Sequence, residues 1–260
     1  MKMISFCNKK GGVGKTTITK NIAYKLALEN KKVLLIDLDP QANLTMEFIS
    51  DEQEIKKTIM NIITTKDAIE NISIKKVIIN SKYKNIDLIA AKKELTKSSY
   101  ILGTMYEKDE IHKISDMLYW NNKEIFDSYD YVLIDYPPTI NELNLSFLVI
   151  SDLIVVPINN ALRALKGFLD LKNNLEIICH QEKREIPDLK ILINNVKDNF
   201  YLEEIKKLIF DFKLETKMLN TKLKESEIFK AVENKLCSIW ENPYYWRQKQ
   251  AYEELISEII

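Results

Sequence analysis

Cysteine is scarce in this chain of 260 residues. The three cysteines are far apart and have no metal-ligand spacing: Cys7, Cys179 and Cys237. An odd number at such separations argues against a disulfide framework and against a zinc site. The N-terminal segment MKMISFCNKKGG also lacks the apolar core of a signal peptide. We therefore expect a protein of the reducing cytoplasm.

Long hydrophobic runs and an excess of one charge are lacking too. The longest apolar stretch, Leu145 to Ile158, is interrupted by Ser151 and Asp152 and is too short to span a bilayer. With 46% hydrophobic residues the chain is not disordered, and we expect a soluble protein with no membrane partner. Its 38 basic and 38 acidic residues create no global field, so nucleic-acid binding would need a local basic patch.

Apolar runs of strand length alternate with helical patterns along the chain. Residues 2–8 form such a run, residues 17–30 have apolar side chains at helical spacing, and VLLIDLD follows at 33–39. This order predicts a βαβ unit. Further strands are expected at 86–90, 131–135, 153–157 and 189–194, and helices at 161–178 and 201–212. We predict an α/β fold, a doubly wound and mainly parallel sheet flanked by helices, in one domain of residues 1–260.

Glycine is scarce as well, yet three of the five glycines, Gly11, Gly12 and Gly14, fall within four positions. They belong to a phosphate loop between an expected strand and an expected helix: Lys10, Gly11, Gly12, Val13, Gly14, Lys15, Thr16 and Thr17. Glycines let successive backbone N–H groups turn toward one anion at the positive end of the following helix. Lys15 would neutralise the β- and γ-phosphates, and the Thr16 hydroxyl would bind Mg²⁺. A glycine-rich turn that binds nothing is the alternative.

Two carboxylates follow expected strands, at the edge where ligands bind in open α/β sheets. Asp39 belongs to the stretch DLDPQAN that begins at Asp37, and Asp135 ends the run YVLID. A carboxylate there can hold Mg²⁺ through water or orient the water that attacks a γ-phosphate. We assign Asp39 and Asp135 to the metal site together with Thr16, whereas Asp37 fits the alternative role of capping the next helix.

Together these motifs resemble the ParA/MinD family of deviant Walker-A ATPases. Lys10 stands where that family has its extra loop lysine, and Lys9 stands where the general P-loop pattern has glycine. The resemblance implies a homodimer that encloses two ATP molecules, with Lys10 of each subunit reaching the phosphates of the other. It makes Asp39 the residue that positions the attacking water and Asp135 the Walker-B carboxylate. It also suggests that Asn194 recognises adenine, although a strand-end asparagine more often forms a turn.

Three branches of that family can be separated by sequence. Iron-protein reductases need cluster-ligating cysteines, and none lies between Cys7 and Cys179. Membrane-cycling division-site members usually end in a basic amphipathic helix, whereas this chain ends AYEELISEII, which anionic lipid would repel. The DNA-segregation branch remains, and the stretch Asp39-Pro40-Gln41 favours it.

A basic segment at 217–243 resembles the part of that branch that contacts DNA. We assign DNA contact to four of its lysines: Lys217, Lys222, Lys224 and Lys230. Lys235, Arg247 and Lys249 add charge nearby. A solvated helical face is the alternative, because glutamates alternate with these lysines. Lys222 and Lys224 are far in sequence from the phosphate loop, so their replacement is expected to leave ATP-driven dimerisation intact.

The sequence therefore predicts a slow Mg²⁺-dependent ATPase that dimerises on ATP and binds DNA without sequence preference. The resemblance implies a centromere-binding, ParB-like partner, a nucleoid-associated location and a plasmid or chromosome as cargo. There is no room for a helix-turn-helix ahead of the phosphate loop, so we expect no operator binding there. The alternative function is a nucleotide-switched scaffold that positions a protein cargo or a membrane complex.

Overall fold

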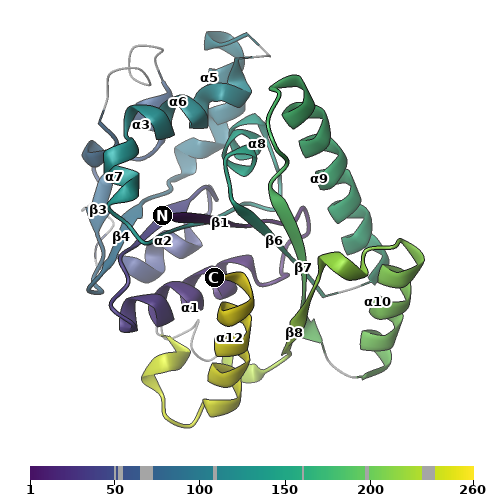
Figure 1. Cartoon of the computed structure of the whole chain (residues 1–260). Coiled ribbons are helices and arrows are strands. Elements are labelled where there is room, and N and C mark those ends of the chain that lie inside the picture. Colours follow the sequence, from purple (N-terminus) through teal and green to yellow (C-terminus); the bar gives the residue numbers. More distant parts are fainter. Residues whose placement is uncertain are drawn as a thin grey trace.

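An eight-stranded sheet runs through the described part of this computed structural model, which comprises residues 1–49, 51, 55–64, 73–107, 110–159, 161–196, 199–229 and 238–260. Its strands are β1 (Lys2–Phe6), β2 (Val33–Asp37), β3 (Ile78–Asn80), β4 (Ile86–Ile89), β5 (Tyr131–Asp135), β6 (Leu153–Ile158), β7 (Asp188–Val196) and β8 (Met218–Lys224). The strand order is β3-β4-β2-β5-β1-β6-β7-β8, and only the pair β3–β4 is antiparallel (Figure 1). The predicted α/β fold is confirmed.

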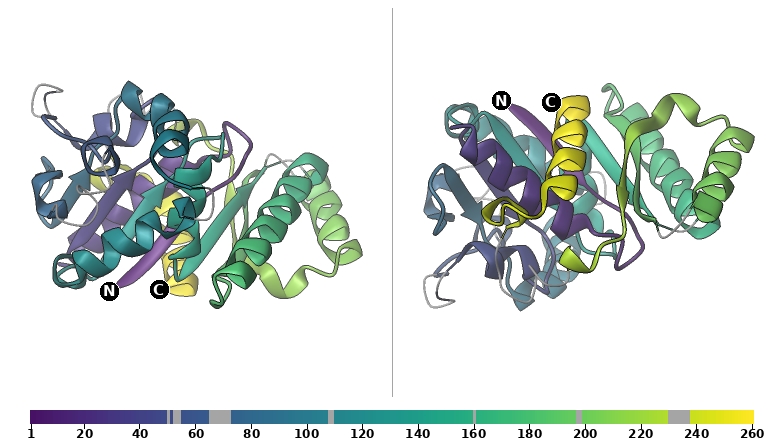
Figure 2. Two further views of the ribbon diagram at one scale, coloured as in Figure 1. Left: turned by 90° about the horizontal axis from the view of Figure 1, so that it is seen from above. Right: turned by 90° about the horizontal axis from the view of Figure 1, so that it is seen from below.

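Helices cover both faces of the sheet (Figure 2). One face carries α1 (Lys15–Leu28), α2 (Asn43–Phe48) and α12 (Trp246–Ile259). The other carries α3 (Met60–Ile63), α5 (Ser98–Met105), α6 (Ile114–Asn121), α7 (Lys123–Asp127), α8 (Glu142–Val149), α9 (Ala161–Gln181) and α10 (Asn199–Asp211). Two cores result because successive strand residues point to opposite faces: Ile4 and Phe6 pack on the side of α1, and Met3 packs on the other. None of the described helices is long and apolar enough to cross a membrane.

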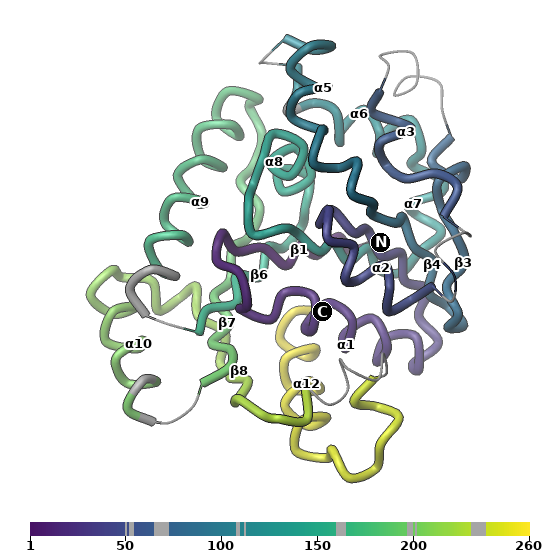
Figure 3. Tube along the Cα trace, turned by 180° about the vertical axis from the view of Figure 1, so that it is seen from behind, coloured from purple at the N-terminus to yellow at the C-terminus, as the bar shows by residue number. Residues whose placement is uncertain are grey.

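The C-terminal helix α12 returns to the middle of the molecule, where it packs against β8 and α1 (Figure 3). Ile260, the residue after α12, lies near β1, since Lys2 Nζ donates to the Ile260 carbonyl at 3.4 Å. Segments from the two ends of the sequence therefore form one layer over the central strands.

Every expected strand is present, and the structure adds β3 and β8, which the sequence pattern did not predict. The alternative of a solvated helical face is wrong for residues 218–224, which form the edge strand β8. Leu219, Thr221 and Leu223 are buried, while the residues between them are exposed or half-buried. This period of two is the strand signal that the glutamate and lysine pattern concealed.

Candidate nucleotide-binding site

The glycine-rich loop connects β1 to α1 at the carboxyl ends of the parallel strands. Gly12 and Gly14 have φ angles of 69° and 86°, a backbone region that favours glycine. A Cβ at Gly14 would also clash with the side-chain nitrogen of Asn194. The loop therefore stands at the N-terminus of α1, where free N–H groups and the helix dipole favour an anion.

Two asparagines outside the predicted site fasten this loop to the end of β6. Asn8 is 2% exposed; its Nδ2 donates to the Pro157 carbonyl at 2.7 Å, and its Oδ1 accepts from the Lys10 backbone N–H at 2.9 Å. Asn159 follows β6, where its Oδ1 accepts from Lys10 Nζ at 2.8 Å and its Nδ2 donates to the Gly12 carbonyl at 3.3 Å. The sequence did not predict a role for either residue because no motif contains them; the only signal was their position, Asn8 at the end of the expected strand 2–8 and Asn159 just after the expected strand 153–157.

Lys15, Thr16 and Asp135 come together beside the loop. The Thr16 hydroxyl donates to Asp135 Oδ2 at 2.6 Å, and Lys15 Nζ donates to the Lys10 carbonyl at 3.3 Å. Burial lowers the pKa of Lys15 below its ordinary value, although the charge of Asp135 opposes that shift. Burial, followed by the charge of Asp37, raises the pKa of Asp135 well above its ordinary value. The opposite charges of Lys15 and Asp135 favour each other's ionised state, but burial outweighs this effect for both groups.

The other oxygen of the Asp135 carboxylate shows what this cluster could hold. Asp135 Oδ1 is buried and has no hydrogen-bond partner among the described residues. Such an atom costs free energy unless an ion or a water satisfies it. Mg²⁺ prefers oxygen ligands and usually keeps several waters, so the Thr16 hydroxyl and this carboxylate fit it. The described residues contain no group of three or more His, Cys, Asp or Glu side chains that could form a protein-only metal site.

The segment after β2 holds one structural carboxylate and one at the site. Asp37 is fully buried, and its Oδ2 accepts from the backbone N–H of Thr45 at 2.9 Å and from its hydroxyl at 2.7 Å. Burial raises the pKa of Asp37 to about 6, against the lowering effect of these hydrogen bonds. Asp39 is 9% exposed, and its Oδ1 accepts from the Gln41 N–H at 2.9 Å. Because Asp37 pairs with Asp135 in the sheet register, Asp39 stands just beyond the same edge.

Asn194, near the end of β7, contacts the phosphate loop directly. Its Nδ2 donates to the Val13 carbonyl at 2.7 Å. Together with Gly12 and Gly14 it lines a hollow of about 260 Å³ that extends to Phe229. The position beside the loop suits a nucleotide base, and base recognition by Asn194 stays a prediction.

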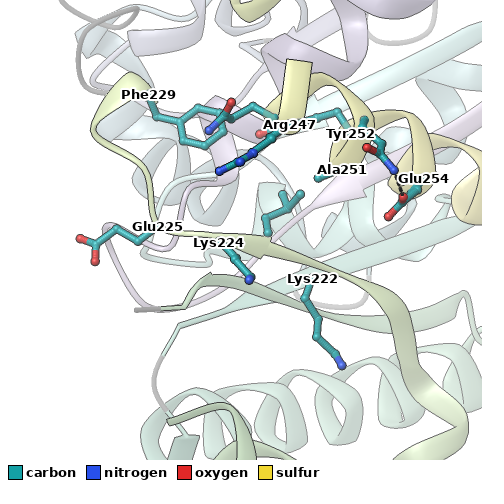
Figure 4. A pocket seen from close by; sticks show the side chains of 11 residues that line it. Lys222, Lys224, Glu225, Phe229, Arg247, Ala251, Tyr252 and Glu254 are labelled. Carbon is teal, nitrogen blue, oxygen red and sulfur yellow. Dashed lines mark hydrogen bonds between the residues drawn. The ribbon is translucent and has the colours of Figure 1, made fainter. Parts of the chain in front are cut away.

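The fold separates the lysines that the sequence assigns to DNA. Lys217 Nζ forms an ion pair with Asp188 at 3.0 Å, so its charge already has a partner. Lys222 and Lys224 project from the face of β8 away from α12, and neither forms an ion pair with another described residue (Figure 4). Lys230 and Lys235 lie outside the described residues.

A groove of about 550 Å³ lies between β8 and α12 (Figure 4). Lys222 and Lys224 border it from β8 with their ammonium groups pointing away from α12, Arg247 borders it from α12, and Glu225 and Glu254 add opposite charge. Lys224 also lines the hollow beside the phosphate loop. Sequence distance is therefore a wrong guide for Lys224, because folding brings this residue next to the nucleotide site.

Known proteins share long stretches of this sequence. A family model described as an AAA domain matches residues 1–191. An uncharacterized protein of Pseudomonas putida is 35% identical over 190 residues, which are 73% of this chain and 67% of that protein. The virulence plasmid ParA family protein pGP5-D of Chlamydia psittaci is 31% identical over 190 residues, or 68% of this chain and 67% of the relative. The sporulation initiation inhibitor protein Soj of Bacillus subtilis is 27% identical over 216 residues, or 81% of each chain.

Solved structures share the fold over nearly the whole chain. A plasmid partition protein of Borrelia burgdorferi bound to AMPPNP has a TM-score of 0.68 and 25% identity, with 99% of each chain covered. A variant of Cyanothece McdA in complex with ATP has a TM-score of 0.80 and 20% identity, covering 99% of this chain and 95% of McdA. The McdA similarity concerns the fold alone, and both agree with the doubly wound P-loop architecture.

Proposed function

Because this chain belongs to the ParA/MinD family of deviant Walker-A ATPases, we propose that it is a Mg²⁺-dependent ATPase that segregates DNA. ATP drives dimerisation, the ATP-bound dimer binds DNA without sequence preference, and hydrolysis to ADP and phosphate ends that state. A centromere-binding, ParB-like partner connects the dimer to a plasmid or chromosome. The partition proteins and Soj among its relatives support this assignment.

The contact between Thr16 and Asp135 beside Lys15 is the observation that carries the nucleotide chemistry. The Thr16 hydroxyl and the Asp135 carboxylate would hold Mg²⁺, which neutralises and orients the phosphates when it is bound. The Lys15 ammonium faces the same place, and phosphate charge there favours its protonated form. The related proteins solved with AMPPNP and with ATP support ATP as the nucleotide.

Asp39 is the residue that we assign to the attacking water. The Gln41 N–H fixes one oxygen of its carboxylate at the carboxyl end of β2, close to the strand that carries Asp135. A carboxylate in that place can orient a water for in-line attack on the γ-phosphate. Its loss should remove hydrolysis while the loop that holds the phosphates stays intact.

The DNA surface that we propose centres on Lys222 and Lys224, with Arg247 across the groove. These cations are available for phosphate contacts that carry no base information. The alternative is a nucleotide-switched scaffold that positions a protein cargo or a membrane complex. Two observations favour it: Lys217 is already paired with Asp188, and glutamates interrupt the basic groove.

A DNA titration of the ATP-bound Asp39→Ala protein at several salt concentrations tests the proposal. We expect similar affinity for unrelated duplexes and a log–log salt slope of about −0.9 for each phosphate neutralised. Replacing Lys222 and Lys224 with Glu removes four lysines from the dimer, so it should weaken binding at least tenfold at low salt and reduce the magnitude of that slope by up to about 3.6. The matched control replaces Lys31 and Lys32 with Glu. Both lysines are exposed between α1 and β2, and their replacement should leave the affinity for DNA nearly unchanged.

Two further measurements separate the alternatives. Binding of a fluorescent ATP analogue must be compared between the parent and the double variant, because Lys224 lies beside the nucleotide hollow. Sedimentation with anionic liposomes tests the membrane version of the scaffold. Absence of DNA binding at low salt, or liposome binding in its place, would contradict DNA segregation and favour the scaffold.

A further inference from the structure

Asn159 holds the side chain of Lys10 against its own subunit. The Asn159 Oδ1 accepts from Lys10 Nζ at 2.8 Å, while its Nδ2 donates to the Gly12 carbonyl at 3.3 Å. One amide thereby ties the Lys10 ammonium to the backbone of the phosphate loop from which it comes. This contact is one of several that hold the loop, since the conformations of Gly12 and Gly14 and the hydrogen bonds of Asn8 also constrain its backbone.

The main chain of Lys10 is fixed while its side chain can move. Its N–H donates to the buried Asn8 Oδ1 at 2.9 Å, and Asn8 is fastened to the Pro157 carbonyl. The Lys10 and Asn159 side chains, in contrast, are half-buried. Rotation about the lysine side-chain bonds can therefore carry the ammonium away from Asn159 without any change in the loop.

We propose that Asn159 is a positioning residue that restrains Lys10 in the monomer and releases it when two ATP-bound subunits meet. This inference depends on the proposed function, in which Lys10 reaches the phosphates of the other subunit. The amide oxygen is a neutral acceptor, whereas phosphate oxygens are charged and form stronger hydrogen bonds with an ammonium. The restraint therefore prevails in the monomer and yields to the phosphates of the partner. Each subunit must break one such contact when the dimer forms. The restraint therefore raises the dimer dissociation constant, and with it the protein concentration at which dimers form.

The expected effect is large enough to measure. One hydrogen bond of this kind shifts an equilibrium by about fivefold, so two released lysines change the dimer dissociation constant by about 25-fold. Asn159→Ala should lower that constant by this factor in the Asp39→Ala background at saturating ATP. Asn159→Leu, which keeps the size but not the amide, should do the same, and Asn159→Gln, which keeps the amide, should return the constant toward the parent value.

Analytical ultracentrifugation over a range of protein concentrations gives these constants, and ATP affinity of the monomer is measured in parallel. Asn159→Ala should leave the monomer's ATP affinity within about twofold, whereas a merely structural role would shift it. The same substitution should not restore dimerisation to a Lys10→Ala protein, because the restraint acts only through Lys10. Weaker dimerisation of Asn159→Ala, or a gain that persists without Lys10, would overturn the inference.

The outcomes also distinguish this inference from the function on which it rests. A parent protein that dimerises with ATP but is unchanged by Asn159→Ala and Asn159→Leu rejects the restraint and leaves the ATPase assignment standing. Two results would reject the role of Lys10 across the dimer, and the restraint with it. One is a parent protein that stays monomeric with ATP at every concentration, and the other is a Lys10→Ala variant that dimerises as well as the parent.

Discussion

Lys20 is a charged residue inside the molecule, with only 1% of its surface exposed. Its ammonium lies 2.5 Å from Glu47 Oε1 and joins α1, which follows the phosphate loop, to α2, which follows the segment of Asp39. The hydrogen bonds from Thr45 to Asp37 hold the same short helix α2. The pair therefore fixes the distance between the two segments that would contact the phosphates and the attacking water.

Removing one partner of the Lys20–Glu47 pair should destabilise the folded protein. Lys20→Met removes the ammonium that lies against the buried Glu47 carboxylate, so we expect a loss of about 3–5 kcal/mol in the free energy of unfolding. Replacing Glu47 with Leu in the same protein should recover most of that loss. Urea unfolding at pH 7 measures both, with Lys25→Met as control; Lys25 is half-buried but its partners Glu29 and Glu253 are exposed to solvent, so each of these pairs should contribute less than about 1 kcal/mol. Equal losses for the two lysines would contradict the argument from burial.

The edge strand β8 and the helix α12 depend on each other. Glu258 on α12 accepts from the backbone N–H groups of Asn220 and Thr221 at 2.7 Å each, and also from the Thr221 hydroxyl. A single carboxylate thus satisfies N–H groups that an edge strand would otherwise leave open to pairing with another chain. Since Lys222 and Lys224 follow directly, the helix also fixes the strand that presents the proposed DNA contacts.

This contact predicts a pH dependence. Partial burial would raise the pKa of Glu258, but the hydrogen bonds from Thr221 and Asn220 outweigh it and hold that pKa below its ordinary value of 4.5. A carboxylate with a depressed pKa stabilises the fold above its ordinary pKa, and that contribution is lost as the pH falls through the folded-state value. Glu258→Gln should therefore cost about 1 kcal/mol at pH 7 and progressively less below pH 4.5. Urea unfolding from pH 7 to pH 3.5 checks this, with Glu254→Gln as control on the same helix; a cost that does not change with pH would contradict it.

Across the whole molecule, the sequence predicted those site residues whose chemical roles can be filled by only a few residue types. The phosphate loop and the strand-end Asp135 could be found because only glycine, lysine, threonine and a carboxylate serve those roles at that spacing. Asn8 and Asn159 could not, because their hydrogen bonds join β1 to β6, and the separation of those strands in sequence hides their contact in space. Lys224 is the converse case: it is distant in sequence but lines the nucleotide hollow.

The site draws residues from β1, β2, β5 and β7, so nucleotide binding should stabilise the entire chain. We predict one unfolding transition for residues 1–260, with a melting temperature that rises when Mg²⁺ and ATP are added. At a ligand concentration 100 times the dissociation constant, binding adds about 2.7 kcal/mol, which corresponds to roughly 5–10 °C for a domain of this size. Lys15→Ala should abolish the rise because the charge facing the phosphates is lost, whereas Asp39→Ala should retain it because the loop is intact. Differential scanning calorimetry measures all three proteins; a parent-like rise in Lys15→Ala would contradict the site, and two separate transitions would contradict the single domain.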